Sequence, residues 1–330
     1  MILTVTLNAA LDVTYRVPVL VPGQTHRVAE VAERAGGKGV NVARVLHALG
    51  EPVVATGLAG GASGGRIRSL LAAEGVREAF VVIAAESRRT VVVYDGEGAT
   101  GLWEPGPTVS ADEWSAFLRR FTDLARDARV VVLSGSLPPG VPADGYAVLI
   151  DLARSAGAQT VLDADQAALR HGLAAGPDLV KPNAEEFAGL VGRALAVPDP
   201  RPGATGPAAD AANGPDAANG LDTAKAVEEV RSLGAREAVA SLGSAGLVAA
   251  TTDGVVRRAF LPEPVAGNPT GAGDACVAAL ARGMIHRHPW PERLRDAVAL
   301  SAAAVIAPVA GSVNLSDYRR LRQTAVIEEV

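Results

Sequence analysis

Apolar and polar positions along the chain follow two alternating patterns. Residues 1–7 alternate as in a β-strand, and short apolar segments at 130–133 and 160–162 have the length of buried strands. Helical spacing precedes each of those two segments, over residues 111–125 and 145–155. Strands that alternate with helices in this way predict an α/β fold with a parallel central sheet.

Polar residues follow several of the predicted strands. Asn8 and Asp12 follow the first strand, Ser136 follows 130–133, and Lys181 follows a short strand at 179–180. Open α/β sheets bind ligands at the carboxyl ends of their strands, so these residues predict a site along one edge. Asp12 could hold a substrate hydroxyl there, although this segment alone fits a plain loop aspartate equally well.

Two regions read as hairpins outside this pattern. The first contains short alternating segments at 13–19 and 28–31, and the second contains segments at 91–94 and 100–104. We expect them to form one small sheet that stands off the core as a lid, from about 12–35 and 88–106. Apolar faces of such strands would be poorly buried in a monomer, which predicts a homodimer that pairs its lids.

Two segments rich in small residues interrupt the periodic patterns. Residues 57–65 contain many glycines and predict a flexible turn before a helix at 66–74. Residues 197–222 are rich in Pro, Ala, Gly, Asn and Asp and contain a short tandem repeat. They predict a surface loop without catalytic function that interrupts, and does not divide, a single domain of residues 1–330.

Composition narrows the class of protein. The formal charge of −5 and the pI near 5.6 argue against a nucleic-acid binder that neutralises phosphates. Cys276 is the one cysteine, which excludes an intrachain disulfide and a Cys-rich metal site. The longest apolar run, 297–310, is shorter than the roughly 20 residues that cross a bilayer, so no membrane role is expected. We expect a cytoplasmic protein.

A glycine-rich loop followed by a helix over residues 267–284 carries the first candidate chemistry. Gly271 and Gly273 expose backbone N–H groups at the start of this helix, where an anion such as a phosphate can bind. Asp274 follows directly, and a carboxylate beside an anion site suits removal of a proton from a hydroxyl that attacks phosphorus. For an isolated motif, a helix cap after a turn remains the stronger interpretation.

A second glycine-rich loop precedes a helix near residue 42. Lys38 and Asn41 lie at its mouth, where they suit a polyol that carries an anion. The spacing of a Walker A loop is absent. Further along, Asn183 and Glu186 are one helical turn apart and could face a hydrated cation, or they could simply cap the helix.

Arg88 lies beside a second arginine just before a predicted lid strand. The planar guanidinium group suits a phosphate. Solvated hairpin charges explain the pair equally well.

Four motifs in order resemble those of the pfkB (ribokinase-type) carbohydrate kinase family. They are residues 35–43, 181–183 with Glu186, 241–243 with Gly246, and 270–274. The resemblance extends over nearly the whole chain. It implies a ribokinase-like three-layer α/β/α sandwich with a small β-sheet lid, ATP and Mg²⁺ as cofactors, and transfer of the γ-phosphoryl group to a sugar hydroxyl.

The resemblance also implies roles by position. Asp274 would be the general base, beside an anion hole formed by Gly271, Ala272 and Gly273. The sugar phosphate would be bound by Asp12, Gly37, Lys38, Asn41, Arg88 and Ser136. The nucleotide would be bound by Lys181, Asn183, Ser241, Gly243, Gly246 and Asn268, and Asn183 and Glu186 would position Mg²⁺ through water.

Further motifs resemble one branch of the family, the 1-phosphofructokinases and tagatose-6-phosphate kinases. They are residues 6–8, 36–39, 104–107 and 134–138. Asn268-Pro269 replaces the common Asp-Thr and is similar to the tagatose-6-phosphate kinase version. We therefore expect phosphorylation of fructose 1-phosphate to fructose 1,6-bisphosphate, with tagatose-6-phosphate kinase or 6-phosphofructokinase activity as the alternatives.

The sequence bears on two other classes of function. A non-catalytic sugar-phosphate or nucleotide sensor could use the same scaffold, because a fold does not fix a function. A dinucleotide-dependent oxidoreductase would need Gly-x-Gly-x-x-Gly directly after the first strand, and residues 8–11 do not offer it.

Overall fold

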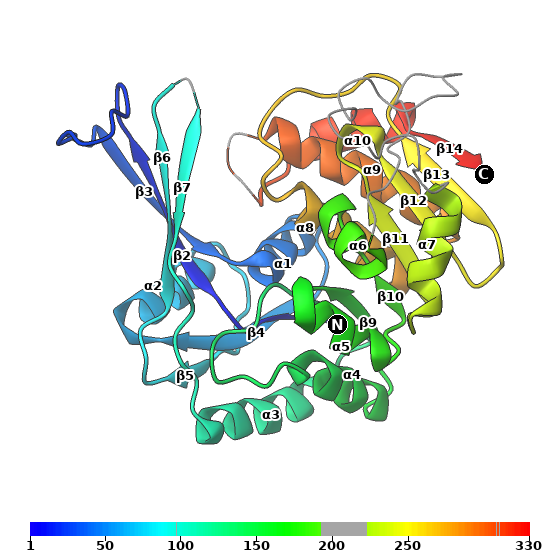
Figure 1. Cartoon of the computed structure of the whole chain (residues 1–330), viewed down its shortest axis with the longest axis horizontal. Helices are drawn as coiled ribbons and strands as arrows, with labels where there is room; N and C mark the ends of the chain where they lie inside the picture. Colours follow the sequence, from blue (N-terminus) through cyan, green and yellow to red (C-terminus); the bar gives the residue numbers. More distant parts are fainter. Residues whose placement is uncertain (97, 193–222, 308, 310) are drawn as a thin grey trace.

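The computed structural model describes residues 1–96, 98–192, 223–307, 309 and 311–330. Within them the chain forms a ten-stranded sheet and a four-stranded sheet (Figure 1). The predicted surface loop at 197–222 lies outside the described residues. No helix among the described residues is long and apolar enough to cross a membrane.

The large sheet is parallel over most of its width. From one edge to the other its strands are β14 (Val326–Glu329), β13 (Val256–Phe260), β12 (Leu247–Ala250), β11 (Glu237–Ser241), β10 (Leu179–Val180), β9 (Gln159–Asp163), β8 (Val130–Ser134), β1 (Ile2–Thr6), β4 (Val53–Gly60) and β5 (Val81–Ile83). Neighbouring strands pair in parallel from β11 through β10, β9, β8, β1 and β4 to β5. The pairs β11–β12, β12–β13 and β13–β14 are antiparallel.

The chain reverses its direction of growth at β1. It first adds β4 and β5 on one side of β1, then returns to add β8, β9, β10 and β11 on the other. Such a switch point opens a crevice at the carboxyl ends of the strands.

Helices cover both faces of this sheet. One layer contains α1 (Lys38–Ala48), α2 (Gly61–Ala73), α8 (Ala272–Ile285), α9 (Trp290–Ile306) and α10 (Leu315–Thr324). The other contains α3 (Ala111–Ala125), α4 (Gly145–Ser155), α5 (Gln166–Ala174), α6 (Ala184–Val191) and α7 (Thr223–Ser232). In β1 the period of two places Ile2 in the first core and Leu3 in the second. The expected three-layer α/β/α fold is confirmed.

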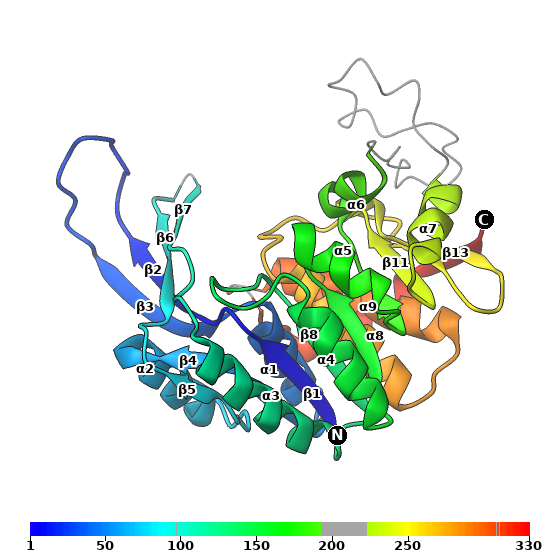
Figure 2. The same ribbon diagram turned by 60° about the horizontal axis from the view of Figure 1, so that its bottom comes forward.

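The four-stranded sheet joins two segments that are distant in sequence. Its order is β3 (Glu30–Gly36), β2 (Ala10–Arg16), β6 (Arg88–Tyr94) and β7 (Ala99–Trp103). Strands β2 and β6 pair in parallel, so the two predicted hairpin regions form one sheet. Figure 2 shows this sheet, which we call the lid, projecting from the main body.

The prediction of a flexible turn at residues 57–65 is wrong. Residues 57–60 complete the fully buried strand β4, and α2 begins at Gly61. A Cβ atom at Gly57 would lie 1.9 Å from the carbonyl oxygen of Thr6 in the neighbouring β1. Glycine is therefore required there by the close approach of two strands, which a reading of local turn propensity could not detect.

Candidate active site

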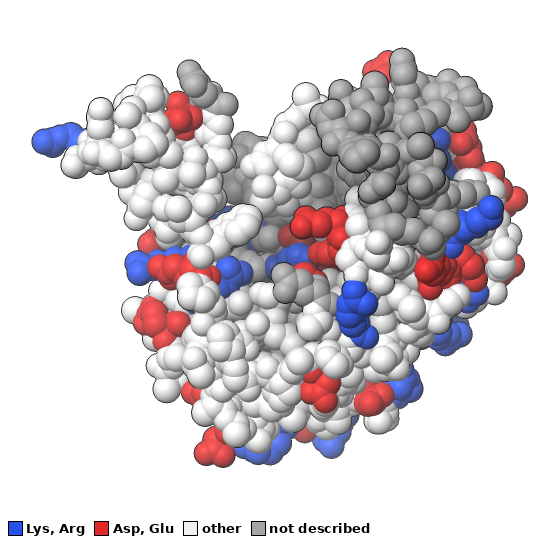
Figure 3. Space-filling view, viewed as in Figure 1, with Lys and Arg blue, Asp and Glu red and all other residues white. Residues whose placement is uncertain are grey.

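A cavity of about 1010 Å³ lies between the lid and the carboxyl ends of β1, β8, β9, β10 and β11. Figure 3 shows this hollow, with acidic and basic side chains gathered at its floor. The cavity is lined by most of the residues singled out from the sequence, namely Asp12, Gly37, Lys38, Asn41, Arg88, Ser136, Lys181, Asn183, Ser241, Gly243, Gly246, Gly271, Ala272, Gly273 and Asp274. Of the predicted set, Glu186 and Asn268 do not line it.

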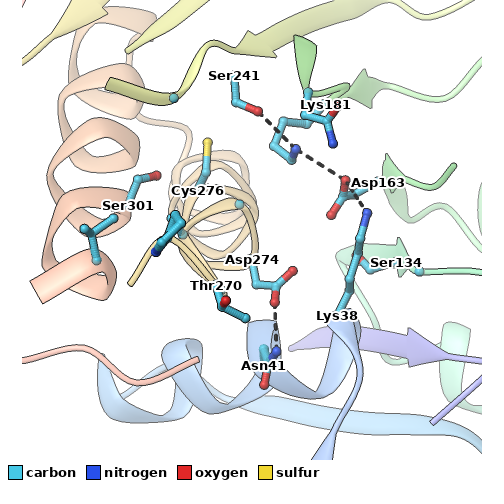
Figure 4. A pocket seen from close by; sticks show the side chains of 18 of the residues that line it. Lys38, Asn41, Ser134, Asp163, Lys181, Ser241, Thr270, Asp274, Cys276 and Ser301 are labelled. Carbon is cyan, nitrogen blue, oxygen red and sulfur yellow. Dashed lines mark hydrogen bonds and ion pairs between the residues drawn. The ribbon is translucent and has the colours of Figure 1, made fainter. Parts of the chain in front are cut away.

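Asp274 lies in the first turn of α8, as predicted, and is only 7% exposed. Asn41 Nδ2, on the facing helix α1, donates a hydrogen bond to Asp274 Oδ2 at 2.8 Å (Figure 4). Burial and then the negative charge of Asp163 raise the pKa of Asp274 to about 7, against the lowering effects of Asn41, Lys38 and Lys181. The Asp274 carboxyl can therefore both hold and release a proton near neutral pH.

The loop before α8 positions its free amides. Gly271 is the N-cap and has a left-handed backbone with φ 86°, and no side chain caps the helix. The Ala272 amide donates to the carbonyl of Pro269 at 3.1 Å. The amides of Gly273 and Asp274 follow in the first turn, where a helix leaves N–H groups without an intrahelical acceptor. This end of α8 thus offers donors and a positive dipole to an anion.

Asn268 belongs to the same loop, where it stabilises the turn and does not line the cavity. Its side-chain Oδ1 accepts a hydrogen bond from the Thr270 amide at 3.0 Å, and its own amide donates to the carbonyl of Val305 at 3.0 Å. The Asn268 side chain therefore holds the turn that leads to Gly271.

Asp163 is a central residue of the site that the sequence reasoning missed. It ends β9 and is 1% exposed, and its Oδ1 lies 3.5 Å from Lys38 Nζ and 3.3 Å from Lys181 Nζ (Figure 4). Neither carboxylate oxygen has a hydrogen-bond partner among the described residues. Asp163 directly follows a predicted strand, as Asp12 follows the first strand, and this position was the signal available in the sequence.

Lys38 faces two acidic residues. Its Nζ donates to Glu186 Oε1 at 3.2 Å besides pairing with Asp163. Burial lowers the pKa of Lys38, but Asp163 and Glu186 more than compensate, so its pKa lies above the ordinary value. Lys38 is a permanent cation at the floor of the cavity.

Asn183 and Glu186 form the capping box of α6. Asn183 Oδ1 accepts from the Glu186 amide at 2.8 Å, and Glu186 Oε2 accepts from the Asn183 amide at 2.8 Å. This is the capping geometry considered from the sequence, with the second oxygen of Glu186 turned towards Lys38.

The lid contributes the opposite wall of the cavity. Arg88 Nε donates to the carbonyl of Asn8 at 3.2 Å, and the Asn8 side chain donates to Ser136 Oγ at 3.1 Å. Burial raises the pKa of Asp12 in β2, while Thr90 and Arg88 lower it. The neighbouring Arg89 is instead 56% exposed and paired with Glu104 outside the cavity, at 3.3 Å. Of the two adjacent arginines, Arg88 is therefore the one available to a ligand.

Comparison with known proteins agrees with this architecture. Residues 5–315 match the model of the pfkB family carbohydrate kinases. The chain therefore belongs to this family and is a carbohydrate kinase, a phosphotransferase.

Several solved structures are similar over their full length. Phosphofructokinase-2 from Escherichia coli in complex with fructose-6-phosphate is 29% identical, with 98% of each chain covered and a TM-score of 0.82. A possible 1-phosphofructokinase from Thermotoga maritima is 26% identical, with 100% of this chain and 99% of that chain covered and a TM-score of 0.80. Ribokinase from Arabidopsis thaliana, 19% identical with 98% of each chain covered and a TM-score of 0.68, shares the fold.

The buried carboxyl of Asp274 predicts a pH-dependent gain in stability for Asp274→Asn. From the ordinary value of 3.8 up to about 7, the native state holds a proton that the unfolded chain has released. Asp274 therefore destabilises the fold increasingly as the pH rises through this window. We expect Asp274→Asn to raise the free energy of unfolding at pH 8 by on the order of 3 kcal/mol, and by much less near pH 5.

Urea unfolding at pH 5, 6.5 and 8 measures this effect. Asp151→Asn is the control, because Asp151 is a surface carboxylate paired with Arg154 and 65% exposed. A gain for Asp274→Asn that does not grow with pH would contradict the prediction.

Proposed function

We propose that the protein is an ATP-dependent hexose-phosphate kinase that converts fructose 1-phosphate to fructose 1,6-bisphosphate. Residues 1–330 would act as one domain whose lid segments are about 12–35 and 88–106. The observation that carries the proposal is the buried Asp274 carboxyl beside the first-turn amides of α8, in a cavity whose lid wall presents Arg88.

Asp274 acts as the general base in this proposal. Ionised Asp274 accepts the proton of the sugar hydroxyl as the hydroxyl oxygen bonds to the γ-phosphorus of ATP and the bond from that phosphorus to the β,γ-bridging oxygen breaks. The products are the phosphorylated sugar and ADP. A pKa of about 7 leaves a substantial fraction of Asp274 ionised at neutral pH. Amides at Gly271 and Gly273 stabilise negative charge on the transferring phosphoryl group. The Ala272 amide, which the family resemblance assigns to the same anion hole, donates to the carbonyl of Pro269 in this structure.

The lid side of the cavity binds the sugar phosphate. Asp12 accepts hydrogen bonds from sugar hydroxyls, assisted by Gly37, Lys38, Asn41 and Ser136. The Arg88 guanidinium pairs with the phosphate that the substrate already carries. This arrangement separates the fixed phosphate from the hydroxyl that reacts.

The opposite side of the cavity takes the nucleotide, bordered by Lys181, Asn183, Ser241, Gly243 and Gly246. Asn268 contributes by holding the turn before α8.

Oxygen-bearing side chains next to the nucleotide side of the cavity fit Mg²⁺. Asp163 has two buried oxygens without hydrogen bonds, and Asn183 and Glu186 lie at the same edge of the large sheet. Mg²⁺ held there through water would neutralise phosphate charge during transfer. Asp163 keeps Lys38 and Lys181 in place beside that charge.

Fructose 6-phosphate and tagatose 6-phosphate are the alternative acceptors of the same site. The E. coli phosphofructokinase-2 structure holds fructose-6-phosphate, and the Thermotoga relative is described as a possible 1-phosphofructokinase. Their identities to this chain are similar, so the choice of fructose 1-phosphate depends on the motifs at residues 36–39 and 134–138.

A coupled ATP-consumption assay across the three sugar phosphates and free fructose tests the function. We expect the highest kcat/KM with fructose 1-phosphate, and a loss of at least about 10²-fold in kcat for Asp274→Asn with ADP and ATP binding retained. Near-normal turnover of Asp274→Asn would reject the base. No turnover of any of these acceptors by the wild-type protein, with ATP still bound, would favour a sensor.

Arg88→Gln tests recognition of the substrate's own phosphate. We expect kcat/KM for the sugar phosphate to fall about 10–100-fold, because a charge-assisted contact is lost. The weak rate with free fructose should change little. Arg89→Gln is the matched control, since Arg89 lies next in the same strand and pairs with Glu104 outside the cavity. Equal losses for both variants, or equal losses with both acceptors, would exclude this role of Arg88.

We also propose a homodimer that pairs two lids. Large apolar side chains are exposed on the lid strands, among them Val31 at 57% and Leu102 at 59%, neither of which lines the cavity. One of the E. coli phosphofructokinase-2 structures is a tetrameric inhibited form.

Light scattering at micromolar concentration tests the dimer. We expect twice the mass of one chain for the wild-type protein and a shift towards one chain mass for Leu102→Glu. Val82→Glu is the control, because Val82 is 63% exposed in β5, outside the lid. A wild-type protein with the mass of a single chain would contradict the dimer.

A further inference from the structure

A chain of hydrogen bonds leads from the surface of α2 to Asp274. Glu74, which follows α2, accepts from Arg44 Nε at 2.6 Å and from Arg44 Nη2 at 3.2 Å. Arg44 Nη1 donates to Asn41 Oδ1 at 2.8 Å, and Asn41 Nδ2 donates to Asp274 Oδ2 at 2.8 Å. Arg44 lies in α1, three residues after Asn41, and is not among the residues that line the cavity.

Arg44 determines which way the Asn41 amide points. An arginine has donors only, so the Asn41 atom that faces it must be the carbonyl oxygen. The NH₂ group of Asn41 is then turned to Asp274 (Figure 4). Gly311 closes the oxygen end, because a Cβ atom there would lie 2.5 Å from Asn41 Oδ1.

Arg44 is fixed in turn by groups away from the cavity. It is 7% exposed, Glu74 binds two of its nitrogens, and its Nη2 also donates to the carbonyl of Ala35 at 2.7 Å. Such a planar, multiply bonded guanidinium has little freedom to rotate.

We propose that Arg44 is a positioning residue for catalysis, which acts by holding the Asn41 amide in the orientation that binds Asp274 Oδ2. Asp274 Oδ2 thereby accepts a hydrogen bond from Asn41, and Asp274 Oδ1 remains available to accept the proton of the sugar hydroxyl. The inference rests on the proposed role of Asp274 as the base. It assigns a function to a residue that touches neither substrate nor the reacting atoms.

The loss of Arg44 has a specific consequence for ionisation. The charged groups that face Asp274 are Asp163 from β9, Lys38 from α1 and Lys181 after β10, and none of them is bonded to Arg44. Without Arg44 the Asn41 amide can rotate and present its oxygen to the carboxylate. The ionised form of Asp274 then loses a donor, so its pKa rises.

The pH dependence of kcat/KM tests the proposal. The wild-type profile should fall below a pH near 7, the pKa of Asp274. In Arg44→Gln we expect this acidic limb to move up by about one pH unit, which is a roughly tenfold loss at pH 6 that largely recovers at pH 9. Arg44→Lys, which keeps the charge and one donor, should show a smaller displacement.

Double substitution separates positioning from general destabilisation. Because Arg44 acts through Asn41, Arg44→Gln added to Asn41→Ala should move the limb no further than Asn41→Ala alone. Arg282→Gln is the matched control, since Arg282 is a helix arginine of α8 with ion pairs to Glu51 and Asp296, remote from the cavity. It should lose stability in urea without moving the limb.

The outcomes are distinct. An unmoved limb in Arg44→Gln, or a uniform loss at every pH like that of a destabilised variant, would overturn the role of Arg44. Wild-type protein without kinase activity, or Asp274→Asn with full activity, would instead overturn the proposed function. Carbon-13 NMR of labelled aspartate carboxyls, assigned with Asp274→Asn, measures the shift of the Asp274 midpoint without an activity assay.

Discussion

The parallel strands end at one edge of the large sheet, and the site depends on this constraint. Strands β1, β8, β9, β10 and β11 each place a polar residue at or just beyond that edge, and the reversal at β1 leaves room above them. Helix α8 then brings its N-terminus to the same place, so that Asp274 and the first-turn amides meet those residues. The site is formed by several segments, which the order of the strands in the large sheet brings together.

This arrangement buries charged side chains, which lowers the stability of the fold. Asp163 and Asp274 are both nearly inaccessible to water, and Lys38 and Lys181 are the cations that offset them. The offset is incomplete at Asp274, whose pKa rises to about 7. A carboxyl that destabilises the fold at neutral pH is at the same time the proposed base, and its proton affinity suits that pH. At Asp274, the burial that lowers the stability of the fold at neutral pH also raises the proton affinity that the proposed base requires.

The lid and the Arg44 contacts approach the site from opposite sides. The lid brings Asp12 and Arg88 over the cavity on strands β2 and β6, whose parallel pairing fixes their relative height. Arg44 lies within α1, away from the cavity, and is linked to Asp274 through Asn41. In the proposed function, substrate recognition therefore depends on a sheet that stands off the body, whereas the orientation of the carboxylate depends on side chains packed within the body.

Much of this could be predicted from local pattern. Alternating strands and helices predicted the α/β class, and the glycine motifs at residues 35–43 and 270–274 predicted two helix starts, because these features depend on neighbouring residues alone. The first motif is not the loop that was expected, since β3 runs to Gly36 and α1 begins at Lys38. The partners of side chains could not be predicted in the same way. Gly57 was misread because β1, far away in sequence, requires it to lack a Cβ atom. Asp163 was passed over because its importance comes from two lysines on other elements, and Arg44 because its link to Asp274 runs through Asn41. The sequence by itself determined the elements and the residues available for chemistry. Only the tertiary structure decided which of those residues meet, since contact between distant segments depends on how the whole sheet is ordered.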